Sequence, residues 1–96
     1  MNDHVEVTDV PVRSRFEISV GGEPAGFARY RTEPDRIVLE HTEIDDAHQG
    51  QGLAGKLARG TLDAIRERGQ RVAAECEYMA GYIARHDEYA DLVAQP

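Results

Sequence analysis

The sequence has a single cysteine, Cys76, and no tryptophan. One cysteine excludes a disulfide within the chain and argues against a cysteine-based zinc site. The four histidines are scattered along the chain without the spacing of metal ligands: His4, His41, His48 and His86. We therefore expect no structural metal site.

Long apolar runs are also missing, and none approaches the roughly 20 residues needed to cross a bilayer. The first residues have neither the basic segment nor the apolar segment of a signal peptide. Basic residues are few, 11 against 18 acidic ones, so the formal net charge is −7. Because nucleic acids and anionic membranes attract positively charged proteins, neither is an expected partner. We expect a cytoplasmic protein whose charge suits a cationic substrate such as an amine.

The first half of the chain has the period-two pattern of β-strands. Residues 5–12, 15–20, 25–31 and 36–45 alternate apolar and polar side chains, which is typical of half-buried strands. Short turns separate them, and Gly21-Gly22 is the strongest turn signal because glycine accepts a positive φ. The last three of these segments predict an antiparallel β-meander, and residues 5–12 are a candidate for one further N-terminal strand.

The second half changes to a helical period. Apolar or small residues form one stripe over residues 52–68, and Gly69 is well placed to end that helix. Gly60, inside the helix, costs about 1 kcal/mol relative to alanine, which suggests close packing there. Residues 71–76 then predict a strand parallel to 36–45, and residues 78–94 predict one or two short helices with a break near His86-Asp87. The fold class is α+β, with helices on a mixed sheet.

Between the meander and the helix lies Gln49–Lys56, the segment with the clearest chemical content. Three glycines crowd a helix start, where unpaired N–H groups and the helix dipole favour a phosphate. The simplest alternative is a capping box formed by Asp46–Gln49, with the glycines making only a loop. That alternative leaves the number of glycines unexplained.

A dinucleotide-binding fold is the second interpretation of the segment. Gly50–Gly55 matches G-x-G-x-x-G, and Glu75 follows at about the distance of a ribose-binding acid. In a dinucleotide fold, however, this motif follows the first strand, and further βαβ units complete the sheet. Here the motif follows a meander, and too few residues remain for a second half.

The third interpretation rests on a family resemblance. The order of meander, Gln49-x-x-Gly52-x-Ala54, helix, strand and helix resembles the GCN5-related N-acetyltransferases. The resemblance implies that acetyl-CoA or coenzyme A is the cofactor, with its pyrophosphate on the loop and its pantetheine arm along the preceding strand near Glu43. The implied cofactor-binding residues are Ile44, Asp45, Gln49, Gly50, Gln51, Gly52, Leu53, Ala54, Gly55 and Lys56.

The resemblance extends to a subgroup. Glu40–Glu43 and Cys76–Tyr89 look like segments of the minimal, YjdJ-type members. That subgroup lacks the helices that follow the first strand in larger relatives and that form one wall of the acceptor site. This chain has no room for them between Pro11 and Arg15.

Four residues are candidates for the chemistry. His41 and Glu43 alternate to one face of their strand, where they form either a proton-accepting pair or a polar surface pair. Cys76 ends the next predicted strand and is either a reacting thiol or a small buried side chain. By resemblance, a tyrosine on the last helix, Tyr82 or Tyr78, is the acid, although core packing explains tyrosines equally well. The backbone near Ile44 is the candidate donor to the thioester oxygen.

Taken together, the sequence predicts a single N-acetyltransferase-like domain over residues 1–96, with a core of about 5–94. The expected function is acetyl-CoA-dependent transfer of an acetyl group to an amine of a small molecule or protein. The alternatives are a non-catalytic module that binds or senses acyl-CoA, and an interaction domain without a ligand.

Overall fold

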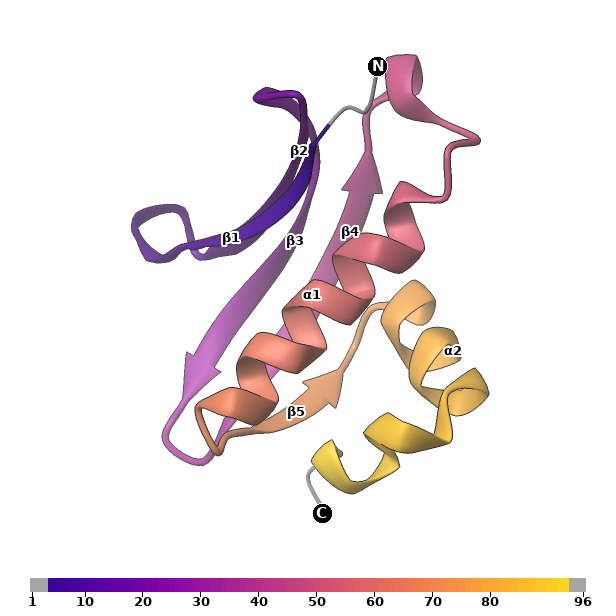
Figure 1. The fold of residues 1–96 in the computed structure, drawn as a ribbon. Coiled ribbons are helices and arrows are strands. Elements are labelled where there is room, and N and C mark those ends of the chain that lie inside the picture. Colours follow the sequence, from indigo (N-terminus) through magenta and orange to yellow (C-terminus); the bar gives the residue numbers. More distant parts are fainter. Residues whose placement is uncertain (1–3, 94–96) are drawn as a thin grey trace.

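A computed structural model describes residues 4–93 of the chain, and the elements follow the predicted order (Figure 1). The α+β fold with a mixed sheet is confirmed. Residue 94, the predicted end of the core and of the last helix, lies outside the described residues. The elements are β1 (Val5–Val10), β2 (Arg15–Val20), β3 (Glu23–Glu33), β4 (Arg36–Ile44), α1 (Leu53–Glu67), β5 (Arg71–Ala74), α2 (Glu77–Arg85) and a 3-10 helix (Asp87–Leu92).

The sheet has the spatial order β1-β2-β3-β4-β5. The first four strands pair antiparallel with their neighbours in sequence, and β5 pairs parallel to β4 after the crossover through α1. The meander of β2, β3 and β4 and the parallel pairing of β5 with β4 were predicted, whereas β1 was only a candidate for a further strand. None of the helices within residues 4–93 combines the length and the apolar character needed to cross a bilayer.

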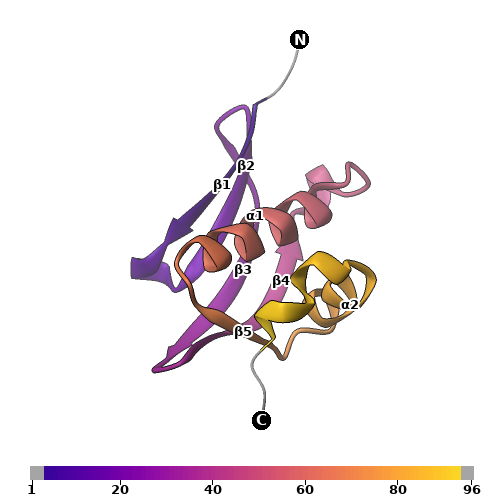
Figure 2. The same cartoon turned by 60° about the horizontal axis from the view of Figure 1, so that its bottom comes forward.

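Helices α1 and α2 pack on one side of the sheet (Figure 2). Alternation in β2 sends Phe16 and Ile18 into the core under the helices and leaves Arg15 and Glu17 on the opposite side. We call these two sides the helix face and the open face. No helix of residues 4–93 lies over the open face. The wall that larger relatives build from extra helices is therefore absent from the described part of the chain.

A partly buried polar cluster joins the end of α1 to the sheet. Asp9 accepts the Tyr30 hydroxyl at 2.7 Å, and the Arg68 guanidinium lies 2.9 Å from the other carboxylate oxygen. Burial, together with the hydrogen bond to Asp9, raises the pKa of Tyr30 to about 12. The cluster fixes where α1 ends relative to β1 and β3.

Gly60 is the point where α1 comes closest to β1, as its unfavourable place in a helix suggested. A Cβ at this residue would lie 2.7 Å from the Cβ of Val7. We expect Gly60→Ala to destabilise the protein by about 1–3 kcal/mol through overpacking, in spite of alanine's better helix propensity. Urea unfolding would measure it. In a Val7→Gly background, which lacks the Cβ that the new methyl group meets, Gly60→Ala should cost little, and an equal loss in that background would contradict close packing as the reason for the glycine.

Three predicted strands had wrong bounds. The first strand ends at Val10 rather than residue 12, because Pro11 starts a 3-10 turn and Ser14 takes a left-handed conformation with φ 53°. The third strand is longer than 25–31 and the fifth is shorter than 71–76. The predicted break near His86-Asp87 is confirmed, and the segment after it is a 3-10 helix.

Candidate functional site

The two central strands separate partway along their length. β4 and β5 pair only from Arg36 to Leu39, and the Leu39 carbonyl accepts the N–H groups of Glu75 at 2.9 Å and Cys76 at 3.0 Å. β4 then continues to Ile44, whereas the segment after β5 turns away into α2. We call this divergence, between residues 40–44 of β4 and the start of α2, the fork.

Backbone groups of β4 point into the fork. The Asp45 N–H donates to the Ala25 carbonyl at 2.8 Å, so it points toward β3. Peptide groups of successive residues point to opposite sides of a strand, and those of Ile44 and Thr42 are therefore directed toward the fork. The Gln49 side chain donates to the Ile44 carbonyl at 2.8 Å. This bond ties the loop that follows to the end of β4.

The glycine segment lies next in the chain, at the same end of β4. Gly50 and Gly52 have φ values of 78° and 73°, and Gly52 caps α1. A Cβ at either glycine would meet no atom within 4 Å, so the outside of the loop is open. The capping box was wrong: the Asp46–His48 segment is a separate 3-10 turn, and no side chain caps it or α1. The first turn of α1 therefore presents its N–H groups without a side-chain cap.

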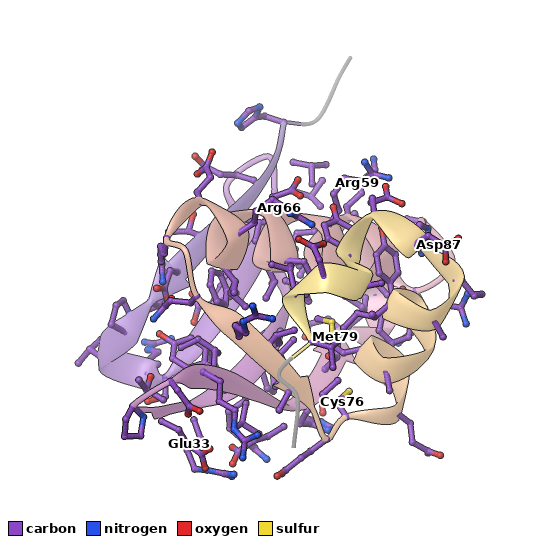
Figure 3. The ribbon with its side chains drawn as sticks, turned by 90° about the horizontal axis from the view of Figure 1, so that it is seen from below. Glu33, Arg59, Arg66, Cys76, Met79 and Asp87 are labelled. Carbon is purple, nitrogen blue, oxygen red and sulfur yellow. The ribbon has the colours of Figure 1, made fainter. Side chains whose placement is uncertain are left out.

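Cys76 stands where β5 passes into α2 (Figure 3). Its side chain is buried, and the thiol donates to the Thr42 hydroxyl oxygen at 3.4 Å. This contact spans the fork from one chain segment to the other. Sequence analysis missed Thr42, although the alternation that puts His41 and Glu43 on one face places the residue between them on the other.

His41 and Glu43 form the predicted pair on the open face. His41 Nε2 lies 3.2 Å from Glu43 Oε1, and both side chains are exposed. The strand register skips Glu40, which makes a bulge just before this pair. The pair and Cys76 lie on opposite faces of the sheet, so the structure does not bring all the candidate catalytic residues together.

Tyr82 is buried against α1. Its ring stacks on His86 with centroids 3.8 Å apart, and His86 Nδ1 lies 2.8 Å from the Tyr82 carbonyl oxygen. Tyr78 is half-buried, and burial raises the pKa of its hydroxyl. Both tyrosines reach the first turn of α1, because a Cβ on Gly55 would lie 3.9 Å from an atom of each. They therefore adjoin the glycine loop.

Charged side chains lie on both sides of the sheet (Figure 3). Arg59 and Arg66 lie on the outer side of α1, whereas Glu33 lies across the sheet (Figure 3). Within residues 4–93, no group of three or more histidine, cysteine, aspartate or glutamate side chains is arranged to hold a metal ion.

Comparison with known proteins gives consistent matches. A family model described as GCN5-related N-acetyl-transferase matches residues 15–92. Protein NATD1 of Mus musculus is 33% identical over 73 residues, which cover 74% of this chain and 66% of that protein, just under two thirds of its length. Streptothricin acetyltransferase of Streptomyces lavendulae is 33% identical over 69 residues, covering 70% of this chain and 36% of that protein.

A solved structure supports the fold. A GCN5-like protein from Staphylococcus aureus, determined by NMR, superimposes with a TM-score of 0.70 and 22% identity. The match covers 95% of this chain and 89% of the other chain. At this identity the likeness concerns the fold alone, including the sheet and the crossover helix.

Proposed function

We propose that this chain, which belongs to the GCN5-related N-acetyl-transferase family, transfers an acetyl group from acetyl-CoA to an amine of a small molecule or protein. The observation that carries the proposal is the place of the glycine loop. The loop joins the end of β4 to α1 beside the fork, and Gln49 ties it to the Ile44 carbonyl. A long ligand can thus meet the uncapped N–H groups at the start of α1 and the peptide groups of β4 that face the fork.

The cofactor-binding residues follow from this arrangement. Coenzyme A supplies the acetyl group as a thioester. The peptide groups of Thr42 and Ile44 would bind the amide-rich pantetheine arm, with Asp45 beside it. The open loop fits a pyrophosphate, because the glycine positions leave room for close approach. The residues proposed to hold it are Gln49, Gly50, Gln51, Gly52, Leu53, Ala54, Gly55 and Lys56, and the last adds a positive charge.

The reaction needs groups that handle protons. A lysine-like amine has a pKa near 10.4 and must lose a proton before it attacks. The pair of His41 and Glu43 is the proposed base, because both side chains are exposed on the open face. Cys76 is the proposed reacting thiol at the fork, with two uses: it takes the acetyl group itself, or it protonates the departing thiolate. Tyr82 is the proposed acid beside the loop.

The net charge of −7 supports an amine acceptor over a nucleic acid or an anionic membrane. The proposal also places the protein in the cytoplasm, in keeping with a single cysteine that has no partner within the chain.

Titration with coenzyme A, followed by NMR, tests the cofactor site. We expect saturable shifts of the backbone amides of residues 49–56, with smaller shifts for Thr42 and Ile44 at the fork. The amides of β1, across the sheet from the fork, serve as the internal control and should stay in place. If the amide resonances of residues 49–56 did not shift, both the proposed cofactor site and the proposed enzymatic function would be contradicted.

The alternative is a module that binds acyl-CoA without transferring the acyl group. The open face favours this alternative, because no helix of the described residues covers it to form a wall of an acceptor site. Incubation with labelled acetyl-CoA and a panel of amines separates the two. Cofactor binding without any labelled product would support the non-catalytic module.

A further inference from the structure

A cavity of about 490 Å³ lies on the open face, within the size range of small-molecule sites. It extends from the connection between β1 and β2 to the end of β4, and its walls include Arg13, Arg15, Glu17, Phe27 and Asp45. The core lies on the helix face, and no residue of the glycine loop lines this cavity. The cavity is therefore additional to the proposed cofactor site and shares with it only Asp45.

One end of the cavity is positively charged. Glu17 accepts hydrogen bonds from Arg13 at 3.3 Å and from Arg15 at 2.8 Å, so one carboxylate balances two guanidinium groups. The hydrogen bond from Arg15 lowers the pKa of Glu17, which keeps that carboxylate ionised. At this end of the cavity two guanidinium groups thus share one carboxylate, while the other acidic residue of the lining, Asp45, lies at the far end, in a chain whose net charge is −7. Guanidinium groups bind carboxylates and phosphates through paired hydrogen bonds.

The other end of the cavity adjoins the proposed base. Phe27 is directly opposite Glu43 in the strand register, and its ring centroid lies 6.0 Å from that of His41. The Arg15 guanidinium lies over the same Phe27 ring, 4.5 Å from its centroid. Phe27 thus links the arginine end to the His41–Glu43 pair, and the carboxylates of Asp45 in the wall and of Glu43 opposite Phe27 suit an ammonium group.

We propose that this cavity binds the acceptor, and that the acceptor is an amine carrying an anionic group, a carboxylate or a phosphate. The anionic group pairs with Arg13 and Arg15, and the amine lies toward His41 and Glu43. The charge separation along the cavity selects such a molecule over a simple alkylamine. This inference rests on the proposed acetyl transfer, which it extends by naming the class of acceptor.

The test uses acceptors that differ only in the anionic group. Acetyl transfer to 4-aminobutanoate, 2-aminoethyl phosphate and butylamine would be measured with the whole chain and acetyl-CoA. We expect kcat/KM for the two anionic amines to exceed that for butylamine by about tenfold or more. The better of the two anionic amines identifies the carboxylate or the phosphate as the natural group.

Two kinds of variant should move KM in opposite directions. Arg13→Gln and Arg15→Gln should raise KM for the anionic amines by about threefold and tenfold, since Arg15 is less exposed. Glu17→Gln removes the competing carboxylate and should lower KM about threefold. Arg31→Gln is the matched control, because Arg31 pairs with Glu33, Glu40 and Glu75 away from the cavity.

A binding measurement separates this inference from the proposed function. 4-Aminobutanoate alone, without coenzyme A, should shift the amides of Arg15 and Phe27, and Arg13→Gln should weaken that shift. Equal use of butylamine and the anionic amines, or a Glu17→Gln variant with raised KM, would overturn the charged acceptor while leaving acetyl transfer intact. Shifts in the cavity without transfer to any amine would overturn the acceptor role and leave only anion binding.

Discussion

Replacing Gly52 with valine is expected to weaken coenzyme A binding by about 100-fold, equivalent to about 2.7 kcal/mol. Gly52 begins α1 at φ 73°, a conformation that β-branched residues avoid. Valine would either strain this cap or rotate the peptide groups that are proposed to face the pyrophosphate. Its side chain would also fill the open space outside the loop. Calorimetric titration with coenzyme A would give the dissociation constants.

Gly69 provides the matched control for this variant. It lies just beyond the other end of α1, has φ 69°, and a Cβ there would meet no atom within 4 Å. Gly69→Val carries a similar backbone penalty and should lower thermal stability by a similar amount. Its coenzyme A affinity should stay within about twofold of the original. Equal loss of binding in both variants would mean that the affinity reports only the stability of α1, and would contradict the loop assignment.

Much of the site could be predicted because it depends on local patterns. Two-residue alternation placed His41 and Glu43 together, and the crowding of Gly50 and Gly52 located the start of α1. Both signals depend on backbone geometry that neighbouring residues determine.

Features that depend on distant segments could not be predicted in this way. Thr42 and Cys76 are 34 positions apart, and only the parallel pairing of β4 with β5 brings them into contact. The interpretation of Asp46–Gln49 as a capping box was wrong for a related reason. Asp46–Gln49 has the right residue types, but two residues in left-handed conformations separate that segment from α1, so α1 starts at Leu53.

The bounds of the third strand were also mispredicted. The alternating pattern limited the third strand to residues 25–31. The structure extends β3 over Glu23–Glu33, with Pro24 at its start and an ion pair of 2.8 Å between Arg36 and Glu33 closing the hairpin. Tertiary pairing overrode the local preference. The cavity on the open face was missed as well, because residues of three strands and three connections line it.

Replacing Cys76 with alanine is expected to lower kcat by about 100-fold or more, the usual contribution of a group that transfers protons or acyl chains. The thiol is the side chain that crosses the fork, through its 3.4 Å contact with the Thr42 hydroxyl. Alanine is smaller and fits the same buried site, so the fold and the coenzyme A dissociation constant should change little. Steady-state kinetics and calorimetry on the same preparation would separate the two effects.

Intact-mass measurement after exposure to acetyl-CoA without an acceptor distinguishes the two uses of the thiol. If Cys76 takes the acetyl group, the wild-type chain gains one acetyl group, free coenzyme A appears in equal amount, and the alanine variant gains none. If the thiol only protonates the departing thiolate, no adduct forms, yet the alanine variant is still slow. Thr42→Val, which removes the acceptor of the S–H group, should slow either route by about tenfold. An alanine variant with unchanged kcat would contradict both routes and leave Cys76 as a small buried side chain that packs the fork.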